Sequence, residues 1–236
     1  MKKLTNKAVG VLKAHDVSLN LLKANDLVAE MIRTEMERRN ILLLNLVSSP
    51  GSGKTSLLEE TIKRLRDEVN IAVLEGDLET ERDADRIRKQ GIPALQIVTG
   101  GTCHLEAQMI HQALPRMNLD DVDILFIENV GNLVCPASYD LGEDVRVTLI
   151  SCTEGDDKPK KYPSMFLTTD VMLVTKTDLL PYVPFSFDAV KKDAEEVNAN
   201  IQTFALSSFK GDGMDRWCEF LLQQLEAKRQ KESVDA

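Results

Sequence analysis

The chain has 236 residues, of which 43% are hydrophobic and only 5% aromatic, which suffices for one well-packed core. Its 29 basic and 38 acidic residues give a formal net charge of -9, which argues against binding to a nucleic-acid phosphate backbone. No apolar run reaches the roughly 18 residues of a membrane-spanning helix, and the N-terminus lacks the apolar stretch of a secretory signal. The four widely spaced cysteines are therefore expected to be reduced thiols or metal ligands in a cytoplasmic protein.

The first predicted elements are a helix and a buried strand. Residues 18–39 carry leucine and methionine at helical spacing between charges, which predicts an amphipathic N-terminal helix. The run 41–48, ILLLNLVS, is apolar almost throughout and predicts a central parallel strand buried on both faces. A helix over 54–67 follows at once.

The same alternation continues to the end of the chain. Further strands are expected over 71–77, 94–100, 123–129, 145–151, 171–176 and 201–207, and further helices over 80–90, 103–114, 188–199 and 213–229. Such alternation predicts an α/β protein with three layers, a mostly parallel sheet with helices on both faces. We expect residues 1–40 to form an N-terminal helical segment and residues 41–230 to form one globular domain. Ligands of such sheets bind at the carboxyl ends of the strands.

The first strand leads into SSPGSGKTS, residues 48–56, which matches the P-loop pattern of nucleotide-binding proteins except that Ser48 replaces its first glycine. Backbone N–H groups of such a loop wrap a phosphate, and the next helix presents its positive N-terminus. Lys54 is expected to reach the β- and γ-phosphates and Thr55 to bind Mg²⁺. The alternative is a glycine-rich turn that merely joins strand and helix. The expected phosphate-loop residues are Gly51, Ser52, Gly53, Lys54, Thr55 and Ser56.

A later strand leads into LVTKTDLL, which matches most of the Asn-Lys-x-Asp pattern with which GTPases read guanine. The Asp178 carboxylate can accept hydrogen bonds from both N1–H and the exocyclic amine of guanine, groups that adenine does not present in that form. Lys176 would lay its apolar stem along the base. Thr175 stands where the pattern has Asn, which puts one tethering contact in doubt. The alternative is a solvated strand exit.

A second segment, ALSSFKGDG, takes the place of the loop that backs the base in GTPases. Ser207 and Ser208 match that loop, whereas Phe209 departs from it. Together with the phosphate loop, these residues predict that the chain binds GTP and GDP with Mg²⁺ in a P-loop NTPase fold.

Two acidic strand ends are candidates for the side of the site that holds Mg²⁺ and water. Asp77 closes IAVLEGD, and Glu128 closes the hydrophobic run ILFIE as a Walker-B acid does. Glu128 and Gly131 have the spacing of the GTPase Asp-x-x-Gly switch, with Glu in place of Asp. We expect Lys54, Asp77 and Glu128 to be catalytic, and Thr55, Asp77 and Glu128 to hold Mg²⁺. As an alternative, either acid caps a helix or a turn.

The segment GGTCHLEA sets Cys103 beside His104 at the expected start of a helix, and Cys135 lies seven residues after Glu128. If both loops lie at one sheet edge, two thiolates and an imidazole converge beside the nucleotide, a ligand set that suits Zn²⁺, Ni²⁺ or Cu rather than Mg²⁺. Three ligands leave one coordination position open. The segment that senses the γ-phosphate also carries Cys135, so hydrolysis is expected to shift a metal ligand.

The alternative for these cysteines is plain packing. Buried free cysteine usually behaves as a small hydrophobe, and Cys152 and Cys218 are expected to do so.

The ordered motifs NLVSSPGSGKT, EGD, TGGTCHL, IENVGNLVCP, TEGDDKPKKYP, TKTDLLPY and LSS…GDG resemble the HypB family, the GTPases that help to insert nickel into [NiFe]-hydrogenase. The Ser48 departure is shared with this family. The resemblance implies a SIMIBI-class GTPase and metallochaperone that dimerises when GTP is bound and carries Ni²⁺ or Zn²⁺ near its dimer interface. It also implies a HypA-type nickel metallochaperone and the hydrogenase large-subunit precursor as partners.

The resemblance assigns the nickel or zinc ligands to Cys103, His104 and Cys135, and it places Lys158 in a loop near the subunit contact. Many family members carry an N-terminal nickel-storage motif. Residues 1–40 here hold no cysteine and one histidine, which predicts transient delivery rather than storage.

Three alternatives come from other functional classes. One is a metal-binding sensor or scaffold in which the nucleotide is only structural, so that metal release ignores hydrolysis. Another is a partitioning-type ATPase, which is disfavoured because Ser49 stands where that class has a signature lysine. The last is a small-molecule kinase, which leaves the Lys-x-Asp motif unexplained.

Overall fold

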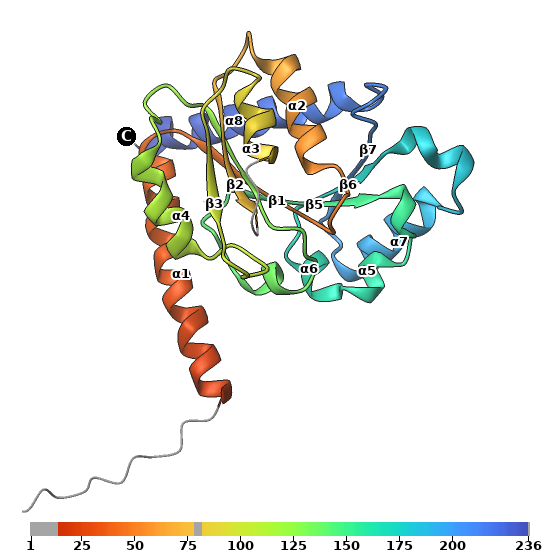
Figure 1. Cartoon of the computed structure of the whole chain (residues 1–236), viewed down its shortest axis with the longest axis horizontal. Helices are drawn as coiled ribbons and strands as arrows, with labels where there is room; N and C mark the ends of the chain where they lie inside the picture. Colours follow the sequence, from red (N-terminus) through yellow and green to blue (C-terminus); the bar gives the residue numbers. More distant parts are fainter. Residues whose placement is uncertain (1–13, 78–81, 236) are drawn as a thin grey trace, which may run out of the picture.

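The computed structural model describes residues 14–77 and 82–235, and within them the chain forms a 7-stranded parallel sheet between two layers of helices (Figure 1). In sheet order the strands are β3 (Ala94–Val98), β2 (Ile71–Asp77), β4 (Ile124–Glu128), β1 (Leu42–Ser48), β5 (Val145–Ser151), β6 (Val171–Thr175) and β7 (Gln202–Ala205). The helices are α1 (Ala14–Arg38), α2 (Lys54–Leu65), α3 (Arg82–Arg88), α4 (Ala107–Ala113), α5 (Lys158–Lys161), α6 (Pro163–Leu167), α7 (Phe187–Val197) and α8 (Met214–Asp235). Short 3₁₀ turns are η1 (Leu114–Arg116), η2 (Cys135–Ser138), η3 (Cys152–Glu154) and η4 (Thr177–Tyr182).

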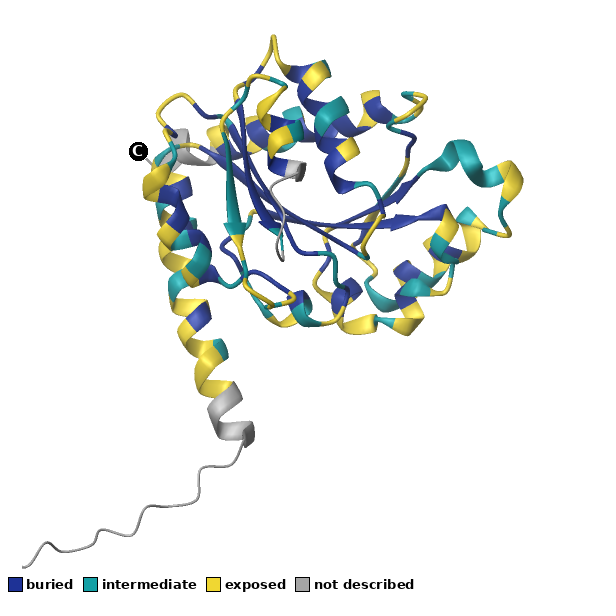
Figure 2. Ribbon diagram, in the orientation of Figure 1, coloured by how far each residue is buried: buried dark blue, intermediate teal, exposed yellow. Residues whose placement is uncertain are grey.

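The central strands are buried on both faces, as the dark blue sheet in Figure 2 shows. Successive residues of a strand point to opposite sides. In β1, Leu44 and Leu46 therefore pack against α2 and α8, whereas Leu43 packs against α1 and α4. Removal of apolar side chains from water on both faces is the main stabilising contribution to this arrangement.

Helix α1 packs along α4 on one face of the sheet (Figure 1). Its buried residues Ala29, Ile32 and Met36 lie at helical spacing and are fully inaccessible to solvent. The boundary expected at residues 40 and 41 falls between α1 and β1, and the division into two units stays a prediction. In the part of the chain that the structure describes, no helix has both the length and the hydropathy that crossing a bilayer requires.

The strand order places the carboxyl end of β1 at the switch point of the sheet. From β1 the chain moves outward through β2 and β3, returns to β4, and then crosses to β5 on the other side of β1. Loops that leave β1 and its neighbours therefore meet at one edge, which is where α/β sheets bind ligands.

The predicted α/β architecture is confirmed, and the expected helix over 103–114 needs correction. Helix α4 begins at Ala107, so Cys103 and His104 lie in the loop before it rather than at a helix start. The reason is a long-range contact: the Leu105 N–H donates to Asn129 Oδ1 at 3.1 Å. Glu106 stays extended, with φ −113° and ψ 153°.

Smaller differences concern lengths and two unexpected helices. Helix α1 begins before residue 18, α8 runs past residue 229, and β3 and β7 are shorter than expected. The sequence pattern did not predict α5 and α6. Of the helix expected over 80–90, the structure shows α3, and residues 80 and 81 lie outside the described residues.

The loop before α4 leaves no room for a side chain at Gly76 of β2. A Cβ there would lie 2.7 Å from Cγ and Cδ1 of the fully buried Leu105. We expect Gly76→Ala to lower the free energy of unfolding by about 1–3 kcal/mol because of overpacking. Urea denaturation measures this loss.

The double variant Gly76→Ala/Leu105→Ala is the matched control. It should lose less stability than the sum of the two single variants, because removal of the leucine side chain makes room for the new methyl group. Strictly additive losses would contradict the contact.

Candidate nucleotide and metal sites

The phosphate loop joins β1 to α2. Gly51 and Gly53 have φ values of 78° and 98°, a left-handed backbone that glycine adopts without strain. Lys54 and Thr55 open α2 and are buried, with 8% and 7% of their surface exposed. The Lys54 Nζ donates to Ser48 Oγ at 3.0 Å, so the lysine folds back along the loop. Serine at position 48 thus supplies a hydrogen-bond acceptor that glycine would lack.

The carboxyl end of β4 reaches the start of α2. The Thr55 hydroxyl donates to Glu128 Oε1 at 2.8 Å, and Glu128 is 5% exposed. Hydroxyl and carboxylate oxygens are the donors that Mg²⁺ takes in proteins. The donor set at this position therefore fits Mg²⁺.

Two further acids share this face of the sheet. Glu75 of β2 lies opposite Glu128 in the parallel pairing and is 2% exposed. Asp77, two residues further along β2, points to the same side as Glu75 because side chains alternate along a strand. Glu75 was not among the expected site residues, although a charge directly after the apolar run IAVL was a signal for it.

On the side of the site where the base is expected, the end of β6 contacts the phosphate loop. Thr175 Oγ1 donates to the Ser52 carbonyl at 2.6 Å, and Lys176 Nζ donates to the Gly51 carbonyl at 2.6 Å. The threonine that replaces the Asn of the guanine pattern therefore still ties this strand to the phosphate loop.

Asp178 lies next to the loop after β7. Its Oδ1 accepts a hydrogen bond from the buried Ser207 hydroxyl at 2.5 Å. Ser208 is half-buried, and Phe209 is 86% exposed. Ser56 is exposed on the first turn of α2, where its hydroxyl accepts from Arg86 at 3.4 Å. The predicted nucleotide-binding residues therefore gather at one edge of the sheet, with Ser56 at its margin.

The Glu154 carboxylate connects Lys158 to the phosphate loop. The Ser52 hydroxyl lies 2.6 Å from Glu154 Oε1, and Lys158 Nζ lies 3.6 Å from Glu154 Oε2. Glu154 also accepts from the Ser151 N–H within a capping box of η3. The contact between Glu154 and Ser52 was not predictable from local spacing, because the two residues lie 102 positions apart in the sequence.

The three expected soft ligands converge on one spot. Cys103 Sγ lies 3.1 Å from Cys135 Sγ and 3.8 Å from His104 Nδ1, and one ligand atom from each of the three residues lies within 4.8 Å of the others. Asn132 Nδ2 donates to the Cys103 carbonyl at 3.3 Å and so ties the two loops together. Two thiols and an imidazole at this separation suit Ni²⁺ or Zn²⁺.

His104 is held in one orientation. It is 8% exposed, and its ring lies against Tyr139 with centroids 4.1 Å apart. Its Nε2 lies 3.6 Å from Glu106 Oε1, which leaves Nδ1 toward Cys103. Burial lowers the pKa of His104 despite the opposing effect of Glu106. The neutral imidazole, the form that binds a metal, is therefore favoured.

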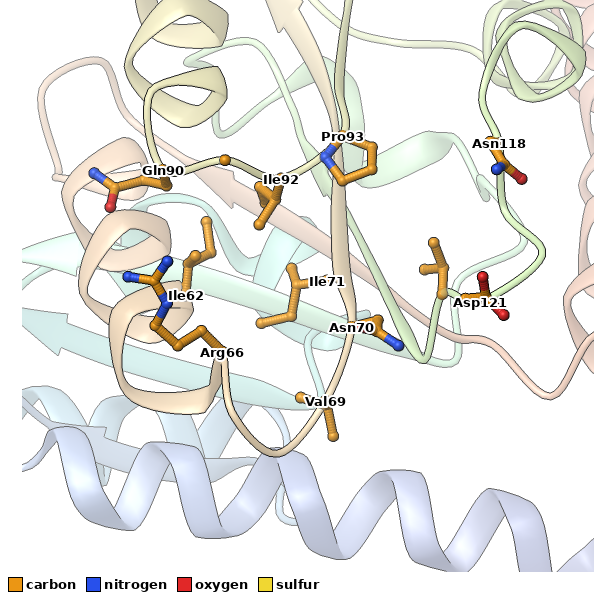
Figure 3. A pocket seen from close by; sticks show the side chains of 12 residues that line it. Ile62, Arg66, Val69, Asn70, Ile71, Gln90, Ile92, Pro93, Asn118 and Asp121 are labelled. Atoms are coloured by element: carbon orange, nitrogen blue, oxygen red, sulfur yellow. The ribbon is translucent and has the colours of Figure 1, made fainter.

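A cavity of about 340 Å³ lies far from both sites, at the amino ends of β2, β3 and β4 (Figure 3). Arg66, Asn70, Gln90 and Asp121 line it together with isoleucines. None of the predicted site residues contributes to its lining, and it takes no part in the chemistry at the opposite edge of the sheet.

Comparison with known proteins identifies the family. Residues 42–205 match the family model described as the CobW/HypB/UreG nucleotide-binding domain. The hydrogenase maturation factor HypB of Escherichia coli strain K12 is 54% identical over 209 residues, which cover 89% of this chain and 72% of that protein. The hydrogenase/urease maturation factor HypB of Helicobacter hepaticus is 43% identical over 216 residues, which cover 90% and 88%.

Solved structures agree with this result. The structure of HypB from Helicobacter pylori in complex with nickel has a TM-score of 0.83 and 41% identity, with 86% of this chain and 96% of that chain covered. HypB from Archaeoglobus fulgidus has a TM-score of 0.81 and 38% identity, with 86% and 99% covered. The 54 kDa signal recognition particle protein of Aeropyrum pernix, at 14% identity and a TM-score of 0.52, shares the fold alone. The chain belongs to the HypB family of hydrogenase maturation factors, which are P-loop GTPases.

Proposed function

We propose that this protein is a metallochaperone that couples GTP hydrolysis to the delivery of nickel during [NiFe]-hydrogenase maturation. Family membership supports GTP as the substrate, and the nickel complex of the Helicobacter pylori relative supports nickel as the cargo. The observation that carries the proposal is that one short segment begins at Glu128, beside Thr55, and leads to Cys135, beside Cys103. Hydrolysis at one end is thereby connected to a ligand at the other.

In this proposal the phosphate loop cradles the phosphates and Lys54 neutralises the β- and γ-phosphate charge. Thr55, Asp77 and Glu128 hold Mg²⁺, which when bound offsets charge on the phosphate oxygens. Asp77 orients the attacking water. The remaining contacts to the phosphates come from Gly51, Ser52, Gly53 and Ser56.

Guanine is read on the other side of the loop. Asp178 accepts hydrogen bonds from the base, Lys176 covers one face, and Ser207 and Ser208 back it. The hydrogen bond from Ser207 to Asp178 supports this assignment because it orients the carboxylate before the nucleotide arrives.

The metal is bound by Cys103, His104 and Cys135, and the open coordination position suits an ion that must leave again. Zn²⁺ fits the same donors. We further propose that the GTP-bound chain forms a homodimer, with Lys158 at the subunit contact. The proposed partners of the protein are a HypA-type nickel metallochaperone and the hydrogenase large-subunit precursor. The four cysteines are free, which suits the reducing cytoplasm in which we place the protein.

Equilibrium dialysis of Ni²⁺ and Zn²⁺ against the nucleotide-free, GDP and non-hydrolysable GTP-analogue forms tests this proposal. We expect metal affinity to differ between the nucleotide states. Cys103→Ala and Cys135→Ala should each weaken binding by at least about tenfold, because each removes a ligand. Cys218→Ala, at a buried site remote from the cluster, is the matched control.

Two results would count against the proposal. Equal metal affinity in all three nucleotide states would favour the sensor or scaffold alternative. Metal binding that survives both cysteine substitutions would remove the Cys103, His104 and Cys135 site.

Thiol alkylation provides an independent test of the metal site. Cys103 is exposed and Cys135 half-buried, whereas Cys152 and Cys218 are buried. Burial keeps the reagent away from Cys152 and Cys218, and it also raises the pKa of Cys152 and raises that of Cys218 to about 11. We expect iodoacetamide to label Cys103 and Cys135 in the folded protein, and Ni²⁺ or Zn²⁺ to protect both, as read by mass spectrometry. Labelling unchanged by either metal would contradict the assignment.

A specificity swap tests the base site. Asp178→Asn replaces an acceptor with an amide that can donate to the C2 carbonyl of xanthine. We expect GTP affinity to fall by about two orders of magnitude or more and xanthosine triphosphate to bind in its place. Asp188→Asn, an exposed aspartate on α7, is the matched control. Unchanged GTP affinity in Asp178→Asn would mean that this residue is only a strand exit.

A further inference from the structure

Residues 128–135 leave β4 and contact both the phosphate loop and the metal loop, residues 99–106, which carry Cys103 and His104. At its start Glu128 accepts from Thr55, and at its end Cys135 faces Cys103. Gly131 lies so close to the phosphate loop that a Cβ would come within 2.9 Å of the Pro50 Cα and N. The segment is therefore in contact with the loop that wraps the phosphates.

Asn129 follows Glu128 directly and is 2% exposed. Its Oδ1 accepts the Leu105 N–H at 3.1 Å, and Leu105 is the residue after the metal ligand His104. The same oxygen accepts the Val130 N–H at 2.9 Å. The peptide next to His104 is thus bound to the end of β4 rather than to its own helix.

The amide nitrogen of Asn129 begins a second connection. Its Nδ2 donates to Asn45 Oδ1 of β1 at 3.3 Å, and Asn45 Nδ2 donates to Glu143 Oε1 at 3.1 Å. Asn45 is fully buried, so an unsatisfied amide there would cost stability. The orientation of each amide is therefore fixed by the next.

This second connection returns to the metal site. Glu143 pairs with Arg146, whose Nη2 donates to the Tyr139 carbonyl at 2.8 Å. The Tyr139 ring lies against His104. Asn129 is therefore connected to His104 twice. One connection is its hydrogen bond to the Leu105 peptide, and the other is the hydrogen-bonded chain that ends at Tyr139.

We infer that Asn129 is a positioning residue that transmits the nucleotide state from Glu128 to His104. This inference rests on the proposed function. When the γ-phosphate shifts the segment 128–131, the Asn129 side chain carries the Leu105 peptide with it and changes the geometry of the imidazole relative to Cys103. The position requires one acceptor and one donor on a short side chain, which asparagine provides.

The test compares nickel affinity in the GDP and GTP-analogue forms of the wild-type chain and of Asn129→Ala. Two linked sites usually affect each other by about 5- to 150-fold. We expect the wild-type ratio of nickel dissociation constants to lie in that range. In Asn129→Ala it should fall to within about twofold of one, while nickel and nucleotide each still bind.

Asn25→Ala is the matched control. Asn25 is also a buried asparagine, 7% exposed, and its Oδ1 accepts the Ala107 N–H at 2.9 Å while its Nδ2 donates to the Asp140 carbonyl. It holds the start of α4, two residues after Leu105, from α1 instead of from β4. We expect Asn25→Ala to keep the wild-type ratio even if it loses as much stability as Asn129→Ala.

Amide hydrogen exchange keeps the inference testable if Asn129→Ala fails to fold. In the wild-type protein we expect the exchange rate of the Leu105 amide to differ between the GDP and analogue forms. Equal rates, an unchanged ratio in Asn129→Ala, or an equal loss of the ratio in Asn25→Ala would overturn the role of Asn129. A wild-type chain whose nickel affinity ignores the nucleotide would instead overturn the proposed function itself.

Discussion

The parallel pairing of β1 with β4 places the phosphate loop and the metal loop at one edge of the sheet. Leu46 lies opposite Glu128, and the Asn129 N–H donates to the Leu46 carbonyl at 3.0 Å. Both strands are buried on both faces, so a slip of one residue would turn every apolar side chain of β4 to the wrong core. Burial thus fixes the register, and the register sets the contact between Glu128 and Thr55.

The phosphate loop is held in shape from its carbonyl side. The carbonyls of Gly51 and Ser52 accept from Lys176 and Thr175, side chains of the strand that also leads to Asp178. A loop whose carbonyls are already satisfied loses less conformational freedom when a phosphate binds its N–H groups. Under the proposed function, the strand that leads to Asp178 therefore contributes to phosphate binding as well as to the choice of nucleotide.

Contiguous motifs and the convergence of loops at one sheet edge were predictable from the sequence, and individual hydrogen bonds between distant residues were not. The phosphate loop and the strand run before it are local patterns, and parallel-sheet logic was enough to bring Cys103 near Cys135. The start of α4 was predicted wrongly because the Leu105 N–H pairs with Asn129, 24 residues away. The tether from Thr175 to Ser52 spans 123 residues, so the replacement of Asn by Thr looked like a loss from the sequence alone.

The site residues that were not predicted from the sequence have one property in common. Glu75, Glu154 and Asn129 are polar groups whose contacts with neighbouring strands or loops depend on the tertiary structure rather than on local spacing. A polar residue inside an apolar strand is a signal that something must satisfy it. It does not say which partner does so.

The buried polar chain Asn129–Asn45–Glu143–Arg146 is not explained by stability alone. Glu143 and Arg146 have side chains only 5% and 8% exposed, and an apolar replacement of such a buried ion pair is often neutral or stabilising. Apolar contacts, however, are non-directional and tolerate sliding of one loop over another. Hydrogen bonds through Asn45 and Asn129 are directional, so the position of the segment that leaves β4 sets the geometry of the Leu105 peptide. The proposed function, in which the metal site binds in one nucleotide state and releases in another, requires that dependence, which directional bonds supply and close packing does not.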